Sequence, residues 1–274
     1  MSRQIKNIIA ITVFLICISL INVAGQNIEI EIRGMNAFTF ILIIAVLLQV
    51  IFFIPSFLLK TEKYYDLVGS LTYVTTVSLA YFAVENKTMI DSIIYFYVMV
   101  WALRLGIYLF RRVRNDGKDV RFEKAKRHFF WFLQYWMGQA LWVSLTACAA
   151  IIAILSPEDN TLPVFAIIGM ALWLSGFAIE SISDYQKRVF RKENNPSESF
   201  IHTGLWARSR HPNYFGEITL WTGIAVIALN TLTGIEYITL ISPVFVYILL
   251  TRISGINLLE RIADEPVSYT HLRA

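Results

Sequence analysis

The stretch Gly34–Leu59 reads GMNAFTFILIIAVLLQVIFFIPSFLL and contains no Asp, Glu, Lys or Arg. A helix that crosses a lipid bilayer needs about 20 mostly apolar residues, because its backbone N–H and C=O groups can form hydrogen bonds only within the segment. The stretch meets this requirement, and it predicts a membrane-spanning helix.

The composition of the whole chain agrees with this prediction. Of the 274 residues, 56% are hydrophobic and only 16% are charged, whereas soluble domains carry about 25% charged residues. These figures exclude a soluble globular domain, a disordered chain, a collagen-like fibre and a small disulfide-stapled scaffold. Cys17 and Cys148 lie in apolar stretches without metal-ligand spacing, so we expect buried small side chains there and no metal site. The chain is predicted to be an integral membrane protein.

Further stretches of spanning length follow along the chain, two of them only if an arginine, Arg104 or Arg252, is accepted inside the span. We therefore expect an all-α polytopic bundle of about 7–8 transmembrane helices. The first span follows Arg3 and Lys6 and has an alternative interpretation as a secretory signal peptide. The predicted spans are Asn7–Ile28, Gly34–Leu59, Leu67–Val84, Ser92–Phe110, Phe129–Pro157, Asn160–Ile179, Ile218–Ile235 and Tyr237–Leu259.

Basic residues mark one end of the predicted spans. Of the 24 Lys and Arg residues, only Arg33 and Lys87 fall at the opposite end, where the connections are acidic, and Arg104 lies within a span. Cytoplasmic loops of membrane proteins carry the excess of basic residues, so we expect both termini in the cytoplasm, in a bacterial inner membrane. Contact with anionic lipid headgroups then explains the basic segment Arg111–Arg127, and the net charge of +4 requires no nucleic-acid partner.

Ionisable residues near the membrane core share this basic end of the helices. Such residues are costly inside a bilayer and usually face a polar cavity or pair with one another. An alternative is that each side chain reaches the interface separately from a helix end. Mixed charges at one depth favour a shared cavity that opens to the cytoplasm, and its predicted members are Asp66, Arg104, Glu180, Asp184, Glu217 and Arg252.

Helical spacing groups some of these residues on one face. Glu180, Asp184, Arg188 and Arg191 follow one another at steps of four, four and three, which places them on the same side of a helix. Carboxylates on such a face suit ribose hydroxyls, and arginines suit phosphates. The spacing therefore predicts a helix face that binds a ligand with ribose hydroxyls and phosphate groups.

A second polar face follows the turn Arg208–Pro212. The proline of this turn suits the first turn of a helix, and Arg210 and His211 would then stand at the positive end of that helix, where anions bind. Asn213 and Glu217 follow as an i, i+4 pair. Two such faces, adjacent in sequence and both in the cytoplasmic layer, strengthen the prediction of a ligand site.

Five segments carry a recognisable pattern: WALRLG at Trp101–Gly106, DVRF at Asp119–Phe122, SDYQKRVFR at Ser183–Arg191, TGLW at Thr203–Trp206 and RSRHPNYFGE at Arg208–Glu217. The pattern resembles the steroid 5-alpha-reductase superfamily, most closely its bacterial branch of unknown function (DUF1295-like), and covers about Asp66 to Asp264. It is more distantly similar to isoprenylcysteine carboxyl methyltransferase-like membrane enzymes. The resemblance implies a polytopic helical enzyme that binds NADPH in a cytoplasm-facing cavity and reduces a carbon–carbon double bond.

The resemblance also implies roles for matching residues. It implies that Asp184, Arg188 and Arg191 contact the cofactor. Residues around the nicotinamide and ribose would be Asn213, Tyr214 and Glu217, and positive charge for the phosphates would come from Arg104, Arg208, His211 and Arg252. Two matches are looser: Trp101 stands near the position of a catalytic tyrosine, and Asp66 stands near that of an acidic proton donor.

The same pattern suggests how the chain is divided. We expect N-terminal transmembrane helices over residues 1–60 and a reductase-like membrane catalytic domain over residues 61–264. Residues 265–274 depart from the family pattern, in which a Trp-Gly motif, spaced tyrosines and a proline follow the last helix. We therefore expect an atypical or truncated tail.

The leading hypothesis is a membrane reductase of the type that acts on CH–CH groups. NADPH would donate a hydride to an apolar, steroid- or lipid-like substrate that enters from the bilayer. The alternative is an S-adenosylmethionine-dependent methyltransferase of the isoprenylcysteine or phospholipid type, although Asn213, Phe215 and the face from Asp184 to Arg191 favour the reductase. A transporter or lipid-binding protein is disfavoured, because the sequence shows no internal repeat.

Overall fold

The computed structural model describes residues 2–116, 119–156, 163–193 and 201–253, and over these the chain is almost entirely helical. The α-helices are α1 (Arg3–Ile21), α2 (Ala37–Leu58), α3 (Tyr65–Ala83), α4 (Met89–Asp116), α5 (Phe129–Leu155), α6 (Val164–Glu193), α7 (Pro212–Ala228) and α8 (Ile241–Ile248). Short helical turns are η1 (Asn22–Gly25), η2 (Val120–Phe122), η3 (Ala125–Arg127), η4 (Gly204–Ala207), η5 (Gly234–Leu240) and the π-type turn η6 (Leu249–Ile253).

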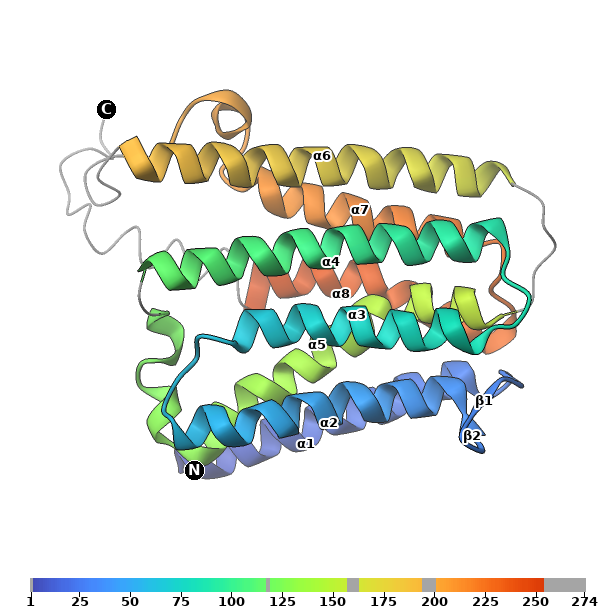
Figure 1. The fold of residues 1–274 in the computed structure, drawn as a ribbon, viewed down its shortest axis with the longest axis horizontal. Helices are drawn as coiled ribbons and strands as arrows, with labels where there is room; N and C mark the ends of the chain where they lie inside the picture. Colours follow the sequence, from blue (N-terminus) through green and yellow to red (C-terminus); the bar gives the residue numbers. More distant parts are fainter. Residues whose placement is uncertain (1, 117–118, 157–162, 194–200, 254–274) are drawn as a thin grey trace.

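The helices run lengthwise and alternate in direction (Figure 1). The starts of α1, α3, α5 and α7 and the ends of α2, α4 and α6 lie on the same side, at the left of Figure 1, which we call the basic end. Helix α5 packs against α1, α2, α3, α7 and α8, and 83% of its most apolar window is buried, compared with at most 39% in the other candidate spans. The centre of the bundle is therefore α5.

Six helical segments of the described part are long and apolar enough to cross a membrane, which makes the chain an integral membrane protein. Helices α3 and α7 are absent from this set, so the prediction of seven or eight spans is supported only in part. With 17 residues, α7 is about 25 Å long, shorter than a bilayer core of about 30 Å. Helix α3 carries a polar face, on which Thr72 and Thr76 are buried.

Other predicted boundaries also shift. The predicted sixth span ended at Ile179, and the residues from Glu180 to Arg191 were expected on one helix face after it; α6 includes both parts and ends at Glu193. The predicted eighth span is divided into η5, α8 and η6. Residues 265–274, the predicted atypical tail, lie outside the described residues.

A small hairpin between α1 and α2 was not predicted. Strand β1 (Glu31–Ile32) pairs antiparallel with β2 (Met35–Asn36) at the end opposite the basic end (Figure 1). The two residues between the strands, Arg33 and Gly34, have φ angles of 56° and 75°, as a two-residue hairpin turn of type I′ requires. Helix α2 starts after the hairpin, and the Asn36 side chain caps it by accepting a hydrogen bond from the Thr39 N–H at 3.1 Å.

Glycines bring α6 and α7 into close contact beside the candidate site. A Cβ atom on Gly176 would lie 2.6 Å from the Gly216 carbonyl oxygen, and one on Gly216 would lie 2.5 Å from the Glu180 backbone nitrogen. Larger residues cannot be accommodated at such distances without moving the backbone. This approach places the polar faces of α6 and α7 against each other.

Candidate functional site

Three helices contribute polar side chains to one buried cluster near the basic end. Trp101 and Arg104 come from α4, Glu180 and Asp184 from α6, and Asn213 and Glu217 from α7. Each pair is spaced by three or four residues, so both members lie on the same helix face. We call these six residues the carboxylate cluster.

Arg104 is the centre of the cluster. Its guanidinium donates hydrogen bonds to Glu180 Oε1 and, at 2.9 Å, to Asp184 Oδ2. The carboxylate side chains are only 2% and 6% exposed, while that of Arg104 is 20% exposed. The arginine also lies over the Phe177 ring, with 5.5 Å between Cζ and the ring centroid. A partly buried cation therefore joins α4 to α6.

Trp101, predicted as a weak catalytic candidate, forms part of the wall of the cluster. Its indole Nε1–H donates a hydrogen bond to Glu180 Oε2 at 3.2 Å. Its ring packs edge-to-face against Tyr73, at a centroid distance of 5.0 Å, and against Trp221, at 4.9 Å. The cluster is thus polar toward the basic end and bounded by aromatic rings toward the middle of the bundle.

The third helix completes the cluster but leaves polar atoms without partners. Asn213 Nδ2 donates to Asp184 Oδ1 at 3.5 Å. Among the described residues, Glu217 Oε1, Asn213 Oδ1 and Arg104 Nε are buried and have no hydrogen-bond partner. Buried polar atoms are almost always satisfied, so several in one place require an explanation. The cluster also holds three carboxylates but only one arginine, an excess of negative charge that a bound donor could offset.

Asp66, predicted as a proton donor, belongs to a different group of charges. Its carboxylate lies 3.6 Å from Arg112 and 3.7 Å from Arg121. Arg121 also forms hydrogen bonds of 2.5–3.0 Å to Asp119 in the α4–α5 connection. Burial raises the pKa of Asp119, but the hydrogen bonds and charge of Arg121 outweigh this effect, so the pKa lies below its ordinary value. We call Asp66, Arg112, Asp119 and Arg121 the loop ion-pair network.

The remaining predicted cations lie nearer the surface. Arg188, Arg191 and Arg208 are exposed, as is Arg252 on η6. The Arg188 guanidinium lies over the Tyr185 ring at 5.3 Å. These positions are accessible to a charged ligand at the basic end.

The start of α7 has the predicted form. Pro212 occupies its first turn, and His211 is the N-cap residue. The imidazole of His211 stacks on the ring of Tyr214, with 5.3 Å between centroids and 9° between planes. His211 and Tyr214, both half-buried, therefore form a flat surface beside the helix start.

Three contributors to the site were not predicted from the sequence. Tyr73 is buried, and its hydroxyl lies within electrostatic range of Glu217. Tyr108 and Lys187 are close enough to Asp184 to interact with it electrostatically. Their spacing carried a signal: Tyr73 lies seven residues after Asp66, Tyr108 four after Arg104, and Lys187 seven after Glu180, so each shares a helix face with a predicted residue.

Comparisons with known proteins show which proteins the chain resembles. The chain is similar to 3-oxo-5-alpha-steroid 4-dehydrogenase 1 of Mus musculus, with 35% identity over 74 residues, 27% of this chain and 29% of the relative. It is 38% identical over 60 residues to the Homo sapiens enzyme of the same name, 22% of this chain and 23% of the relative. The chain thus matches less than a third of the length of these relatives. No solved structure matches it.

A family profile matches most of the chain. The profile described as "Protein of unknown function (DUF1295)" covers residues 52–272, a range that includes the carboxylate cluster and the loop ion-pair network. The chain is therefore a member of the DUF1295 family, with a distant and partial similarity to steroid 5-alpha-reductases.

Proposed function

We propose that this protein is a membrane reductase that uses NADPH to reduce a carbon–carbon double bond in an apolar substrate. The observation that carries the proposal is the set of unpartnered polar atoms in the carboxylate cluster: Glu217 Oε1, Asn213 Oδ1 and Arg104 Nε. The partial similarity to 3-oxo-5-alpha-steroid 4-dehydrogenase 1 supports the same reaction class.

The chemistry of these atoms fits the carboxamide of a nicotinamide. That group offers two N–H donors and one carbonyl acceptor. Glu217 Oε1 and Asn213 Oδ1 are acceptors, while Arg104 Nε is a donor, so the two sets are complementary. Among the described residues, Asp184 Oδ1 accepts a single long hydrogen bond, from Asn213 at 3.5 Å. It is therefore available to a ribose hydroxyl.

The phosphates would be held at the basic end. Arg188, Arg191, Arg208 and Arg210 are exposed there, and guanidinium groups bind phosphate through paired hydrogen bonds. Their number exceeds what a pyrophosphate requires, so we propose that a 2′-phosphate is also bound and that NADPH is preferred to NADH.

When bound, the nicotinamide supplies the hydride. The chain's own residues would hold the carboxamide, exclude water and provide a proton. Trp101, Trp221 and Tyr73 form an aromatic wall that keeps the reacting face dry. In this arrangement the Tyr73 hydroxyl is the proton donor to the substrate, in place of Asp66, whose carboxylate is held in the loop ion-pair network. An apolar substrate would reach the wall from the bilayer.

The test is nucleotide binding to the purified full chain, measured separately with NADPH, NADH and S-adenosylmethionine by equilibrium dialysis. We expect NADPH to bind most tightly. Replacing Asn213 by Ala should weaken NADPH binding about tenfold, because one hydrogen bond and its orienting contact to Asp184 are lost.

The matched control is Asn230→Ala, which removes the same side chain at the other end of α7, where Nδ2 donates to the Ile227 carbonyl at 3.2 Å. This variant should bind NADPH like the unaltered protein. Binding of S-adenosylmethionine without binding of NADPH would instead support the methyltransferase alternative.

A further inference from the structure

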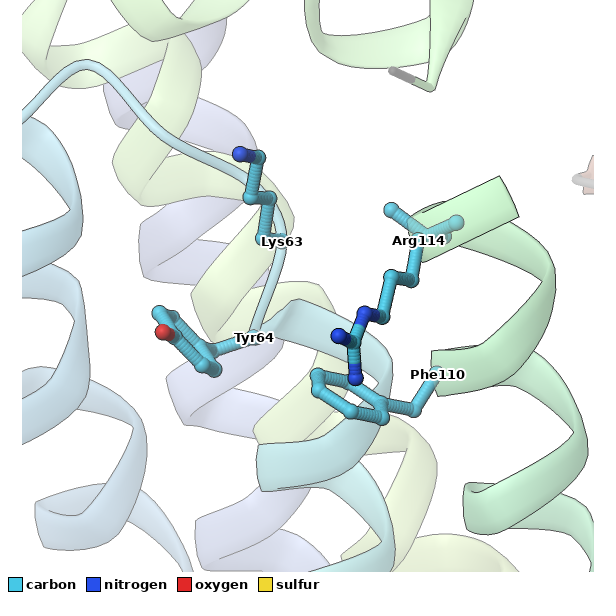
Figure 2. A pocket seen from close by; sticks show the side chains of 5 residues that line it. Lys63, Tyr64, Phe110 and Arg114 are labelled. Carbon is cyan, nitrogen blue, oxygen red and sulfur yellow. The ribbon is translucent and has the colours of Figure 1, made fainter. Parts of the chain in front are cut away.

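A cavity of about 330 Å³ lies at the basic end, outside the carboxylate cluster. Figure 2 shows Lys63 and Tyr64, from the α2–α3 connection, on one side, and Phe110 and Arg114, on the last turns of α4, on the other. The Arg114 guanidinium lies beside the Phe110 ring, and the Lys63 side chain points away from it. Val113 also lines the cavity. The lining therefore combines two cationic side chains with two aromatic rings, and Tyr64 and Phe110 stack with 6.3 Å between centroids.

Within the part of the chain that the structure describes, the two cations of this cavity differ from their neighbours in having no counter-charge. Lys126 pairs with Glu62 at 2.9 Å, and Arg112 and Arg121 pair with Asp66. Lys63 and Arg114 are exposed and form no ion pair with any side chain that the structure describes. Two such cations that line the same cavity are suited to binding one anion.

The α2–α3 connection that carries Lys63 and Tyr64 is firmly held. The buried Glu62 carboxylate accepts a hydrogen bond from the Asp119 N–H at 3.2 Å and pairs with Lys126. The Thr61 N–H donates to the Ser56 carbonyl at 2.9 Å. A connection fixed at the two residues before Lys63 keeps one wall of the cavity in place, which lowers the entropic cost of binding.

A second cavity of about 320 Å³ adjoins the first, because Tyr64 lines both. It lies between α2 and α3 and is almost wholly apolar; its lining includes Phe52, Pro55, Leu59, Leu67, Val68 and Leu71. Leu59, Leu67 and Leu71 are exposed at the surface of the bundle, where they would meet lipid. The pair of cavities is therefore amphipathic, with a cationic part at the helix ends and an apolar part along the spans.

We propose that these cavities bind one anionic phospholipid, with its phosphate between Lys63 and Arg114 and an acyl chain in the apolar cavity between α2 and α3. Cations at the basic end of a membrane protein attract anionic headgroups, and Tyr64 stands where aromatic residues mark the membrane interface. The shared chemistry is a phosphate ester, which a soluble phosphate compound could also supply. The adjoining apolar cavity favours the lipid.

The experiment is native mass spectrometry of the full chain in mixed micelles that contain phosphatidylglycerol or phosphatidylcholine with the same acyl chains. We expect phosphatidylglycerol to be retained in preference to phosphatidylcholine. The double variant K63Q/R114Q should lose this preference about 25-fold, because each basic residue near an anionic lipid contributes about fivefold. The control variant K60Q/R111Q carries the same change of charge at exposed positions outside the cavity, and it should retain the preference.

Two further measurements distinguish a bound lipid from a bound soluble phosphate compound. Leu71→Trp fills the apolar cavity without changing the charge, and it should reduce phosphatidylglycerol retention. Inorganic phosphate in excess should not displace the lipid. Equal retention of both lipids, equal losses in the two double variants, or full displacement by inorganic phosphate would each overturn the proposal. Melting temperatures of all variants in lipid-free detergent identify any variant that fails to fold. The single variant Lys63→Gln, a change at an exposed position, is then measured in place of that variant.

Discussion

Replacing Glu217 by Gln should have opposite effects on the stability of the protein and on nucleotide binding. Glu217 is 7% exposed, and its Oε1 atom has no hydrogen-bond partner among the described residues. It also lies within electrostatic range of two other carboxylates, Glu180 and Asp184. The substitution preserves the shape of the side chain but removes a buried and poorly compensated charge.

The magnitudes follow from that arrangement. A buried polar group without a partner costs about 1–3 kcal/mol, and more when it is charged. Removing the charge should therefore raise the free energy of unfolding of the unliganded protein by roughly 1–3 kcal/mol. A hydrogen bond to a charged group contributes about 1.5–3 kcal/mol, so its loss should weaken NADPH binding about ten- to a hundredfold.

Both quantities are measured on the same detergent preparation, as a melting temperature without ligand and as an NADPH dissociation constant. The matched control is Glu236→Gln, another buried carboxylate at the opposite end of the bundle. Glu236 accepts hydrogen bonds from the Thr233 N–H at 2.7 Å, from Thr233 Oγ1 at 3.2 Å and from Ser156 Oγ at 3.5 Å. Because this carboxylate is satisfied, its variant should melt at a lower temperature and bind NADPH normally.

A purely structural role for Glu217 makes the contrary forecast. The Glu217→Gln variant would then behave like the control, with a lower melting temperature and unchanged NADPH affinity. That result would refute the assignment of Glu217 to the nucleotide site.

Three other predictions concern the fold and its orientation. Gly176→Val should destabilise the protein by about 1–3 kcal/mol or more, seen as a lower melting temperature, because its side chain would meet the backbone of α7 at Gly216. The lowered pKa of Asp119 means that its contribution to stability is complete above about pH 4 and is lost as the pH falls through the lowered pKa; Asp119→Asn should remove this part of the acid dependence of the melting temperature. Reporter fusions at Asn115 and Asn160 should report opposite sides of the membrane, with Asn115 in the cytoplasm, and the same side for both would contradict the proposed topology.

The helices could be predicted from the sequence because lipid imposes length and apolarity on each span. The ends of the helices are given only approximately by a search for apolar runs, since such a search does not detect amphipathic extensions. The end of α6 was indicated only by helical spacing, which placed Glu180 to Arg191 on one helix face; the helix ends at Glu193. The hairpin was missed for another reason: Arg33 in a left-handed conformation is an uncommon residue for such a turn, so only Gly34 gave a signal.

The candidate site could also be predicted only in part from the sequence. Spacing along one helix correctly grouped Glu180 with Asp184 and Asn213 with Glu217, since i, i+4 neighbours share a face. Spacing cannot say which helices face each other. Arg104 joins Glu180 and Asp184 across 76 and 80 residues of sequence, and this pairing depends on how α4 packs against α6. For the same reason, Asp66 was expected in the cavity but pairs with Arg112 and Arg121 instead.

The most direct test of the central claim is to follow the transferred hydride. Purified protein is incubated with a membrane lipid extract and NADPH that carries deuterium at the transferable position of the nicotinamide, with Glu217→Gln as the control. The account predicts that deuterium enters a carbon–hydrogen bond of an apolar product that has lost one double bond, at a rate much lower in the variant. Bound NADPH without any transfer of deuterium, or transfer of a labelled methyl group from S-adenosylmethionine in a parallel reaction, would contradict it.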